Sequence, residues 1–312
     1  QIESDVVVPL EVVSGKAEYA ARTIRPKIHK HLNDYLVEFK PTKIKKSSLQ
    51  LRISGIDLSH IHAVLKKMSL DRTVLPVSGF FKGGTTRARK MFAKFLRRRF
   101  KNYAENSNQP QTDDVSHMSK YLHFGQISPL YLALQVQGTD KRFKEAREAF
   151  LEELVVRREL AMNFVYYTPQ YDSYRCLPNM AKKTLSYHKK DKREQTYTRR
   201  QLENARTHDE YWNAAMREMK STGFMHNYMR MYWGKKILEW SASPRKAYET
   251  TLALNNKYFL DGRDPNSFAG VGWIYGLHDR AWFERDIFGK VRYMAASGLE
   301  RKCDIQGYVK KV

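Results

Sequence analysis

The sequence predicts a mostly α-helical protein, and three observations indicate this fold class. From residue 85 onward, apolar residues recur three and four positions apart in most segments, as on the buried face of a helix. Only Val6-Val7-Val8 has the pattern of a buried strand. Hydrophobic residues make up 42% of the 312 residues and aromatic residues 12%, so the chain can bury a substantial core.

The amino-terminal segment 1–15 is predicted to be the last strand of a truncated α/β domain. Val6-Val7-Val8 runs into Pro9, and Ser14-Gly15 ends the segment. Because a single strand cannot form a sheet by itself, we expect the rest of that domain to lie upstream in a longer protein.

Residues 16–84 are predicted to link this strand to the main domain. The pattern is helical from Ala17 to about Phe39, and polar and basic over 40–58. A short segment at 59–70 precedes a loop that is marked by Pro76 and three glycines.

Residues 85–312 are predicted to form the helical domain. It begins with a basic amphipathic helix, Thr85–Tyr103, and a polar loop over 104–117. Further helices are expected at Asp140–Tyr167, Asp209–Met219, His226–Trp240 and Pro244–Asn256. Two segments are expected to be loops, Lys182–Gln195 and the glycine-rich 259–276.

The charge balance predicts a polyanionic partner. Lys and Arg outnumber Asp and Glu by 56 to 33, and the net charge is +23. Because aromatic residues interleave the basic ones, nucleic acid is favoured over a membrane surface. Two cysteines exclude a disulfide framework, and neither a signal peptide nor a membrane-spanning run is apparent, so we expect an intracellular protein.

All five tryptophans lie in the last third of the chain. Trp233 and Trp240 are seven residues apart on a predicted helix, so they share one face with about 10 Å of rise between them. Trp212, on a neighbouring helix, can lie between them. A large core residue is the ordinary role of a tryptophan, but such a series can also carry an electron from solvent to a buried redox cofactor.

Arg230 and Asp261 are candidates for a charged pair beside such a cofactor. Arg230 precedes Trp233 by three residues, so both lie on nearly the same helix face. An arginine stabilises negative charge on a reduced flavin ring, and an aspartate accepts a hydrogen bond from a ring N–H. An ordinary structural salt bridge is the alternative.

Two further segments carry polar candidates. The polar loop that contains Ser116, His117 and Ser119 leads into a helix and offers amides and hydroxyls that suit a phosphate. Glu153 and Arg157 lie on an otherwise apolar helix stripe, where a carboxyl group is costly to bury unless it is paired or protonated. An ion pair between residues i and i+4 is the alternative.

The longest motifs resemble class II cyclobutane pyrimidine dimer photolyases. The resemblance is carried by the residues from Phe150 to Tyr167, from Tyr228 to Lys236 and from Leu260 to Asn266, with support from Thr23–Ile28 and His278–Trp282. It extends from about residue 6 to the carboxyl terminus. It implies a helical FAD-binding domain whose α/β antenna domain is almost wholly absent, and it does not identify the antenna chromophore.

The resemblance implies a role for each matched residue. Trp233, Trp212 and Trp240 match the photoreduction chain, in that order outward from a non-covalent FAD. Asn255 matches the residue that faces flavin N5, and Glu153 matches the acid that hydrogen-bonds the dimer. The residues implied to bind FAD are Tyr103, Ser116, His117, Met118, Ser119, Phe150, Arg157, Arg230, Asn255, Asp261, Gly262 and Arg263. Those implied to contact the flipped dimer or its DNA are Glu153, Met231, Trp273, Trp282 and Arg280.

The function implied is light-driven repair of cyclobutane pyrimidine dimers in double-stranded DNA by a monomer. Photoexcited, fully reduced FAD would donate an electron to a flipped-out dimer, as expected for enzymes that extrude their target base. A cryptochrome-like photosensor and a flavin-free DNA-binding module are the alternatives, while a (6–4) photolyase would need catalytic histidines and only His226 is near. Ser107 and Asn227 depart from the family pattern, which expects arginine and glycine.

Overall fold

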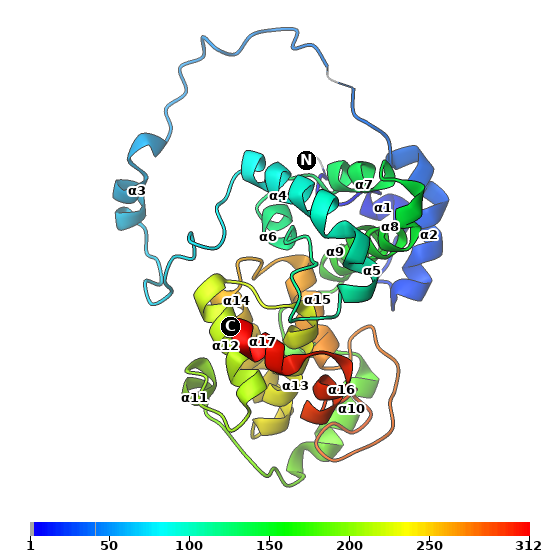
Figure 1. Cartoon of the computed structure of the whole chain (residues 1–312), viewed down its shortest axis with the longest axis vertical. Coiled ribbons are helices and arrows are strands. Elements are labelled where there is room, and N and C mark those ends of the chain that lie inside the picture. Colours follow the sequence, from blue (N-terminus) through cyan, green and yellow to red (C-terminus); the bar gives the residue numbers. More distant parts are fainter. Residues whose placement is uncertain (1–2, 41) are drawn as a thin grey trace.

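The computed structural model describes residues 3–40 and 42–312 and confirms the predicted helical fold (Figure 1). Gln1, Ile2 and Pro41 lie outside the described residues, so the predicted first segment and connector are tested only without them. The only β pairing in the described part is an isolated bridge between Arg285 and Gly289. None of the described helices is both long and apolar enough to cross a bilayer.

The helices fall into two groups around two apolar cores. The first group comprises α1 (Leu10–Val13), α2 (Ala21–Tyr35), α4 (Thr85–Arg98), α5 (Tyr103–Asn106), α6 (Ser119–His123), α7 (Pro129–Gln137) and α8 (Lys144–Leu151). The second comprises α10 (Asn179–Tyr187), α11 (Arg199–Glu203), α12 (Glu210–Thr222), α13 (Asn227–Trp240), α14 (Pro244–Tyr258), α16 (Ala296–Lys302) and α17 (Ile305–Lys311). Helices α9 (Arg158–Tyr167) and α15 (Pro265–Ile274) pack against each other and join the two groups (Figure 1).

The strand predicted at Val6-Val7-Val8 is wrong. The segment is buried, but it pairs with no strand, and the chain turns into α1 at Leu10. The amides of Val7 and Val8 donate instead to Oε1 of Glu159 on α9, at 2.8 and 3.0 Å. A carboxylate therefore supplies the acceptor that a neighbouring strand would have supplied. The predicted domain boundaries at 15 and 84 remain predictions.

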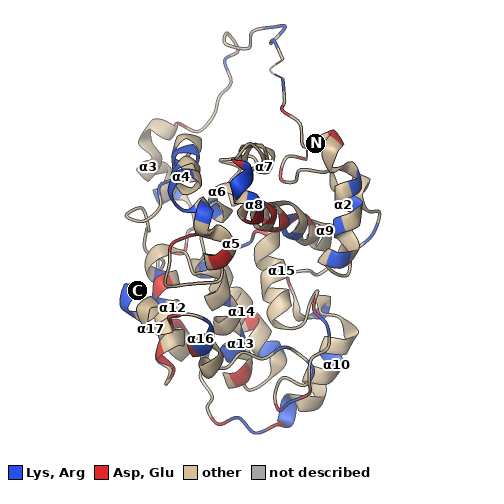
Figure 2. Cartoon of the chain, turned by 45° about the vertical axis from the view of Figure 1, so that its right-hand side comes forward, with Lys and Arg blue, Asp and Glu red and all other residues tan. Residues whose placement is uncertain are grey.

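The segment that follows α2 extends away from the body of the molecule (Figure 1). It contains a 3₁₀ helix at Leu58–His60 and the short helix α3 (Ile61–Lys67), and no residue of either is buried. Lys and Arg residues are spread over both groups of helices, with several along α2 and α4 (Figure 2).

Two predicted loops contain helices. Lys182–Gln195 overlaps α10, because Ala181 and Leu185 are buried at helical spacing between exposed polar residues. The segment 259–276 contains α15, which has Asp264 as its N-cap and Pro265 at its first position. Its glycines predict a loop, but Gly272 lies in a helix where a Cβ atom would be 2.6 Å from the Leu277 side chain. That glycine allows close packing.

The predicted helix Asp140–Tyr167 is confirmed as one helical stretch with a change of pitch. Residues Glu152–Arg157 form a π-helix between α8 and α9. π-Helical turns are rare and often occur at functional sites.

Candidate functional site

A cavity of about 960 Å³ lies between the two groups of helices, which is at the upper end for small-molecule sites. We call it the central cavity. Twelve of the residues singled out from the sequence line it: Tyr103, Ser116, His117, Met118, Ser119, Phe150, Glu153, Arg157, Arg230, Met231, Asp261 and Trp273. They come from α5, the loop before α6, the first residue of α6, α8, the π-helix, α13, the loop after α14, and α15.

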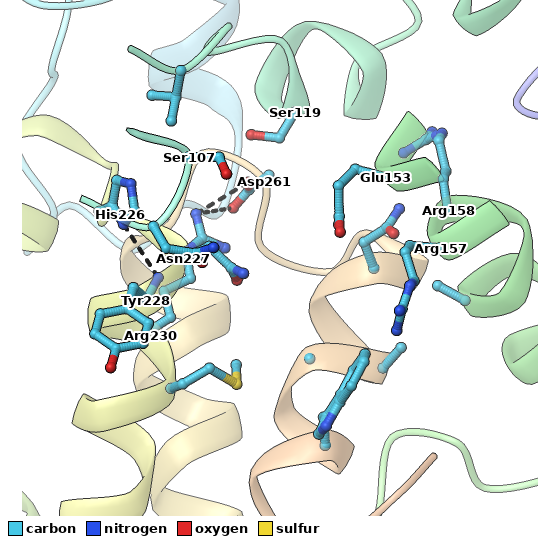
Figure 3. A pocket seen from close by; sticks show the side chains of 18 of the residues that line it. Ser107, Ser119, Glu153, Arg157, Arg158, His226, Asn227, Tyr228, Arg230 and Asp261 are labelled. Atoms are coloured by element: carbon cyan, nitrogen blue, oxygen red, sulfur yellow. Dashed lines mark hydrogen bonds and ion pairs between the residues drawn. The ribbon is translucent and has the colours of Figure 1, made fainter. Parts of the chain in front are cut away.

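Arg230 and Asp261 form an ion pair on one wall of the central cavity (Figure 3). The Nη2 atom of Arg230 lies 3.1 Å from Oδ2 and 2.9 Å from Oδ1 of Asp261. Arg230 Nε also donates to the Met225 carbonyl oxygen at 3.1 Å, and the guanidinium lies 3.8 Å from the Phe259 ring centroid. Asp261 Oδ1 is buried and has no well-directed hydrogen bond among the described residues.

Glu153 faces the cavity from the other wall (Figure 3). Its side chain is accessible from the cavity, yet desolvation by the surrounding protein raises its pKa, against a lowering effect of Arg157. The expected i,i+4 pair with Arg157 does not form. Because the π-helix brings residues five apart together, Arg157 Nε donates to Glu152 Oε1 at 3.0 Å instead. No hydrogen bond of the Glu153 carboxyl is found in the described part of the chain.

Glu152 and Trp273 complete the surroundings of Arg157. Glu152 also accepts two hydrogen bonds from Arg25 on α2, at 2.7 and 3.0 Å. The Arg157 guanidinium lies 5.4 Å from the Trp273 ring centroid, within cation–π range. Trp273 is thereby placed on the same wall as Glu153.

Two of the predicted relay tryptophans, Trp233 and Trp240, lie on α13, and the third, Trp212, lies on α12. The Trp212 and Trp240 rings are 5.7 Å apart, and the Trp212 indole N–H donates to the Trp233 carbonyl oxygen at 2.9 Å. Trp233 lies 6.2 Å from the Phe259 ring, which contacts Arg230. All three indoles are buried, with exposures of 0–3%. Trp240 is covered on its outer side by Tyr197 and His208, at 5.4 and 5.3 Å.

Five singled-out residues outside the relay do not line the cavity. Asn255 is buried behind Ser267, which does line it, and the two side chains exchange hydrogen bonds of 2.7 and 3.0 Å. Gly262 is needed for a close backbone approach, since its Cβ would be 2.9 Å from the Phe259 carbonyl oxygen. Arg263, with φ +66°, completes this turn.

The other two, Arg280 and Trp282, lie in an outer loop near the cavity. The guanidinium groups of Arg280 and Arg292 each lie 5.0 Å from the Trp282 ring centroid. Arg292 also lines the cavity, so the stack of Arg280, Trp282 and Arg292 reaches the edge of the cavity. The sequence reasoning had not singled out Arg292.

Several other lining residues were missed. Asp264 pairs with Arg158 at 3.6 Å and with His123 at 3.3 Å, and its N-cap position before Pro265 was a signal that could have revealed it. Lys235 is fully buried, and burial lowers its pKa to about 7. Both departures from the family pattern, Ser107 and Asn227, line the cavity.

His226 caps α13 and is structural in this geometry. Its Nδ1 accepts from the Tyr228 amide at 3.2 Å, and burial lowers its pKa to about 4. The ring is therefore neutral near pH 7.

Relatives match the chain over its whole length, although no family model matches it. It is 50% identical to the deoxyribodipyrimidine photo-lyase of Methanothermobacter thermautotrophicus, 43% to that of Oryza sativa and 41% to that of Potorous tridactylus. Each match covers 100% of this chain and, respectively, 68%, 62% and 58% of the relative. The chain thus spans about two thirds of the length of these proteins.

Solved structures share the fold at low sequence identity. A class III photolyase from Agrobacterium tumefaciens has a TM-score of 0.70 at 15% identity, over 99% of this chain and 60% of that one. A photolyase from Sulfolobus tokodaii, solved with two FAD molecules, has a TM-score of 0.66 at 16% identity, over 99% and 60%. On the sequence identity to its relatives, the chain belongs to the deoxyribodipyrimidine photo-lyase family.

Proposed function

We propose that this chain is the FAD-binding, DNA-repairing part of a class II photolyase, which uses light to split cyclobutane pyrimidine dimers. One observation carries the proposal. A single cavity has an Arg–Asp pair backed by a series of three tryptophans on one wall, and on the other a carboxyl group that no described residue hydrogen-bonds. An electron-donating cofactor and an electron-accepting substrate need these two environments side by side.

The residues present fit FAD. The Asp261 carboxylate lines the cavity and offers an acceptor for a ring N–H, and Arg230 offers positive charge beside it. The loop from Ser116 to Ser119 reaches the cavity at the start of α6, where amides and hydroxyls suit a pyrophosphate. When bound and reduced, FAD supplies the electron that photoexcitation releases. Asn255 lies behind the cavity wall and positions the lining residue Ser267 through hydrogen bonds.

The chain's own side chains bind and orient the dimer. In its protonated form, Glu153 donates a hydrogen bond to a carbonyl oxygen of the dimer, where negative charge develops. Trp273, held by Arg157, provides a surface on which the extruded bases stack. Met231 lines the same space.

Arg280, Trp282 and the dispersed basic residues hold double-stranded DNA around the lesion. Trp282 replaces stacking that is lost on base extrusion, and the net charge of +23 makes affinity fall steeply with salt. We expect the protein to act as a monomer at cellular DNA.

The test is illumination of dimer-containing duplex with the chemically reduced, FAD-loaded protein. Recovery of thymine absorbance in blue light, and none in the dark, supports the proposal. A protein that binds FAD and photoreduces it without any recovery is instead a cryptochrome-like photosensor. A colourless, folded protein that takes up no FAD is the flavin-free alternative.

A further inference from the structure

The loop 279–292 carries Arg280, Trp282 and Arg292, and its position depends on a histidine of the segment that follows α10. The ring of His188 is 8% exposed. Its Nδ1 lies 2.6 Å from Asp191 Oδ2, and its Nε2 lies 3.0 Å from Glu284 Oε1. His188 therefore contacts two segments that are about a hundred residues apart in sequence.

Further contacts show that the loop is seated on this site. The Ile287 amide donates to Asp191 Oδ2 at 2.8 Å, and the Lys290 amide donates to Thr184 Oγ1 at 3.0 Å. A Cβ atom at Gly289 would be 2.0 Å from Thr184 Oγ1 and 2.8 Å from the His188 ring. The backbone of the loop thus lies directly against the histidine.

The seated part of the loop is connected to the tryptophan. The Trp282 amide donates to the Lys290 carbonyl oxygen at 2.9 Å, and Arg285 and Gly289 exchange backbone hydrogen bonds of 3.1 and 2.8 Å. Because Lys290 is fixed on Thr184, the backbone at Trp282 is fixed with it. Arg292, at the end of the loop, stacks on Trp282 and lines the central cavity.

We propose that His188 is a positioning residue for DNA binding, because its two bonds to Asp191 and Glu284 hold the loop 279–292 in the arrangement that presents Trp282, Arg280 and Arg292 beside the cavity. This inference rests on the proposed function, in which that loop contacts DNA. It assigns a role to a residue that touches neither cofactor nor lesion.

The arrangement requires a proton. Ionised carboxylates only accept hydrogen bonds, whereas a neutral imidazole has a single N–H. Both bonds form together when the ring is an imidazolium, and the carboxylate of Glu284, followed by that of Asp191, raises the pKa of His188 above its usual value. We call the two hydrogen bonds of His188, to Asp191 and to Glu284, the clamp. Both bonds of the clamp are present at low pH, and one is lost as the pH rises through the raised pKa of His188.

The titratable groups that face the ring come from three segments. Asp191 belongs to the segment after α10, where Arg193 donates to the Asp191 carbonyl oxygen at 3.0 Å. Glu284 and Asp286 belong to the loop, and an Asp286 carboxylate oxygen lies within 4.8 Å of a ring nitrogen. Tyr187 on α10 contacts the ring edge at 5.1 Å between centroids. The surroundings are predominantly anionic, which favours the protonated ring.

The test measures affinity for dimer-containing and undamaged duplexes from about pH 5.5 to about pH 9, at constant salt, with the FAD-loaded protein and a chelator present. We expect wild-type affinity for the lesion to weaken about tenfold across this range, since a hydrogen bond to a charged group contributes about 1.5–3 kcal/mol. H188Q has one donor group and no charge. It should be about tenfold weaker at the acidic end, with a flat profile.

Two further variants complete the experiment. E284Q removes a half-exposed carboxylate, so it does not threaten the fold, and it should shift the pH midpoint of binding downward. H62Q, at an exposed position on α3, is the matched control and should keep the wild-type profile. Repair yield per bound lesion should be equal in all of them, because the clamp affects binding alone.

The outcomes separate the two claims. A wild-type protein without preference for the lesion overturns the proposed function and this inference with it. A clear lesion preference, with H188Q and E284Q both following the wild-type pH profile, overturns only the role of His188. If H188Q does not fold, E284Q decides. A downward shift of its pH midpoint of DNA binding supports the role of His188, and an unshifted midpoint overturns it.

Discussion

On one wall of the central cavity Arg230 and Asp261 neutralise each other, while across from them Glu153 faces the cavity with no hydrogen bond to any residue that the structure describes. The first wall is rigid, because the ion pair is packed on Phe259 and backed by the buried tryptophans. The second wall is a π-helix. There Arg157 donates its hydrogen bond to Glu152, so it does not pair with Glu153. The difference suits a cofactor that stays bound and a substrate that comes and goes.

The largest effect is expected from breaking the ion pair. Arg230→Met leaves Asp261 charged and without its partner, since the two side chains are only 18% and 10% exposed. We expect the free energy of unfolding to fall by about 3–5 kcal/mol, together with loss of FAD. Urea unfolding and the flavin content of the purified protein measure this. Recovery of much of that stability in a variant that also carries Asp261→Asn is the control, and wild-type stability of Arg230→Met alone would contradict the account.

A smaller effect is expected where the two walls meet. Gly234 on α13 packs against α15, and a Cβ there would lie 2.2 Å from the end of the Ile274 side chain. Gly234→Ala should lower the free energy of unfolding by about 1–3 kcal/mol through overpacking. Gly270→Ala is the matched control, because its Cβ meets nothing within 4 Å. Alanine's better helix propensity should make that control neutral or stabilising by up to about 1 kcal/mol. Equal effects of the two variants would mean that the walls are not in close contact.

The smallest effect on stability is expected from Glu153→Gln. Because the folded-state pKa of Glu153 is raised, its ionisation destabilises the fold as the pH rises from about 4.5 through that raised value. The amide removes this penalty, which we expect to be below about 1 kcal/mol since the group is accessible. Repair yield should fall more than DNA affinity. Thermal unfolding at two pH values, with a repair assay, measures both, and a loss confined to affinity would reduce Glu153 to a binding residue.

The sequence was sufficient to predict the helical class, the main helices of the second group and twelve cavity residues. Helical spacing identifies buried faces, and motif resemblance locates polar groups at those faces. It was insufficient at α15, where glycines that permit close packing resemble glycines that break helices. It also could not predict the π-helix, because one extra residue per turn changes the partner of Arg157 without any signal in composition.

Contacts between residues far apart in sequence also could not be predicted from the sequence pattern. Glu159 lies in a matched motif, but nothing in the sequence indicated that its carboxylate accepts from Val7 and Val8, which replaced the predicted strand. The placement of Asn255 behind Ser267 likewise depends on how α14 meets α15.

The measurement that tests the central claim most directly compares two light reactions of Trp233→Phe. The claim is that one cavity places a flavin between the buried tryptophans and the lesion. Phenylalanine keeps the packing of an aromatic ring but is a much poorer electron donor, so photoreduction of oxidised flavin should be lost. Repair by the chemically reduced variant should stay at the wild-type level. Unaltered photoreduction, or loss of both reactions in a folded, FAD-loaded protein, would contradict the account.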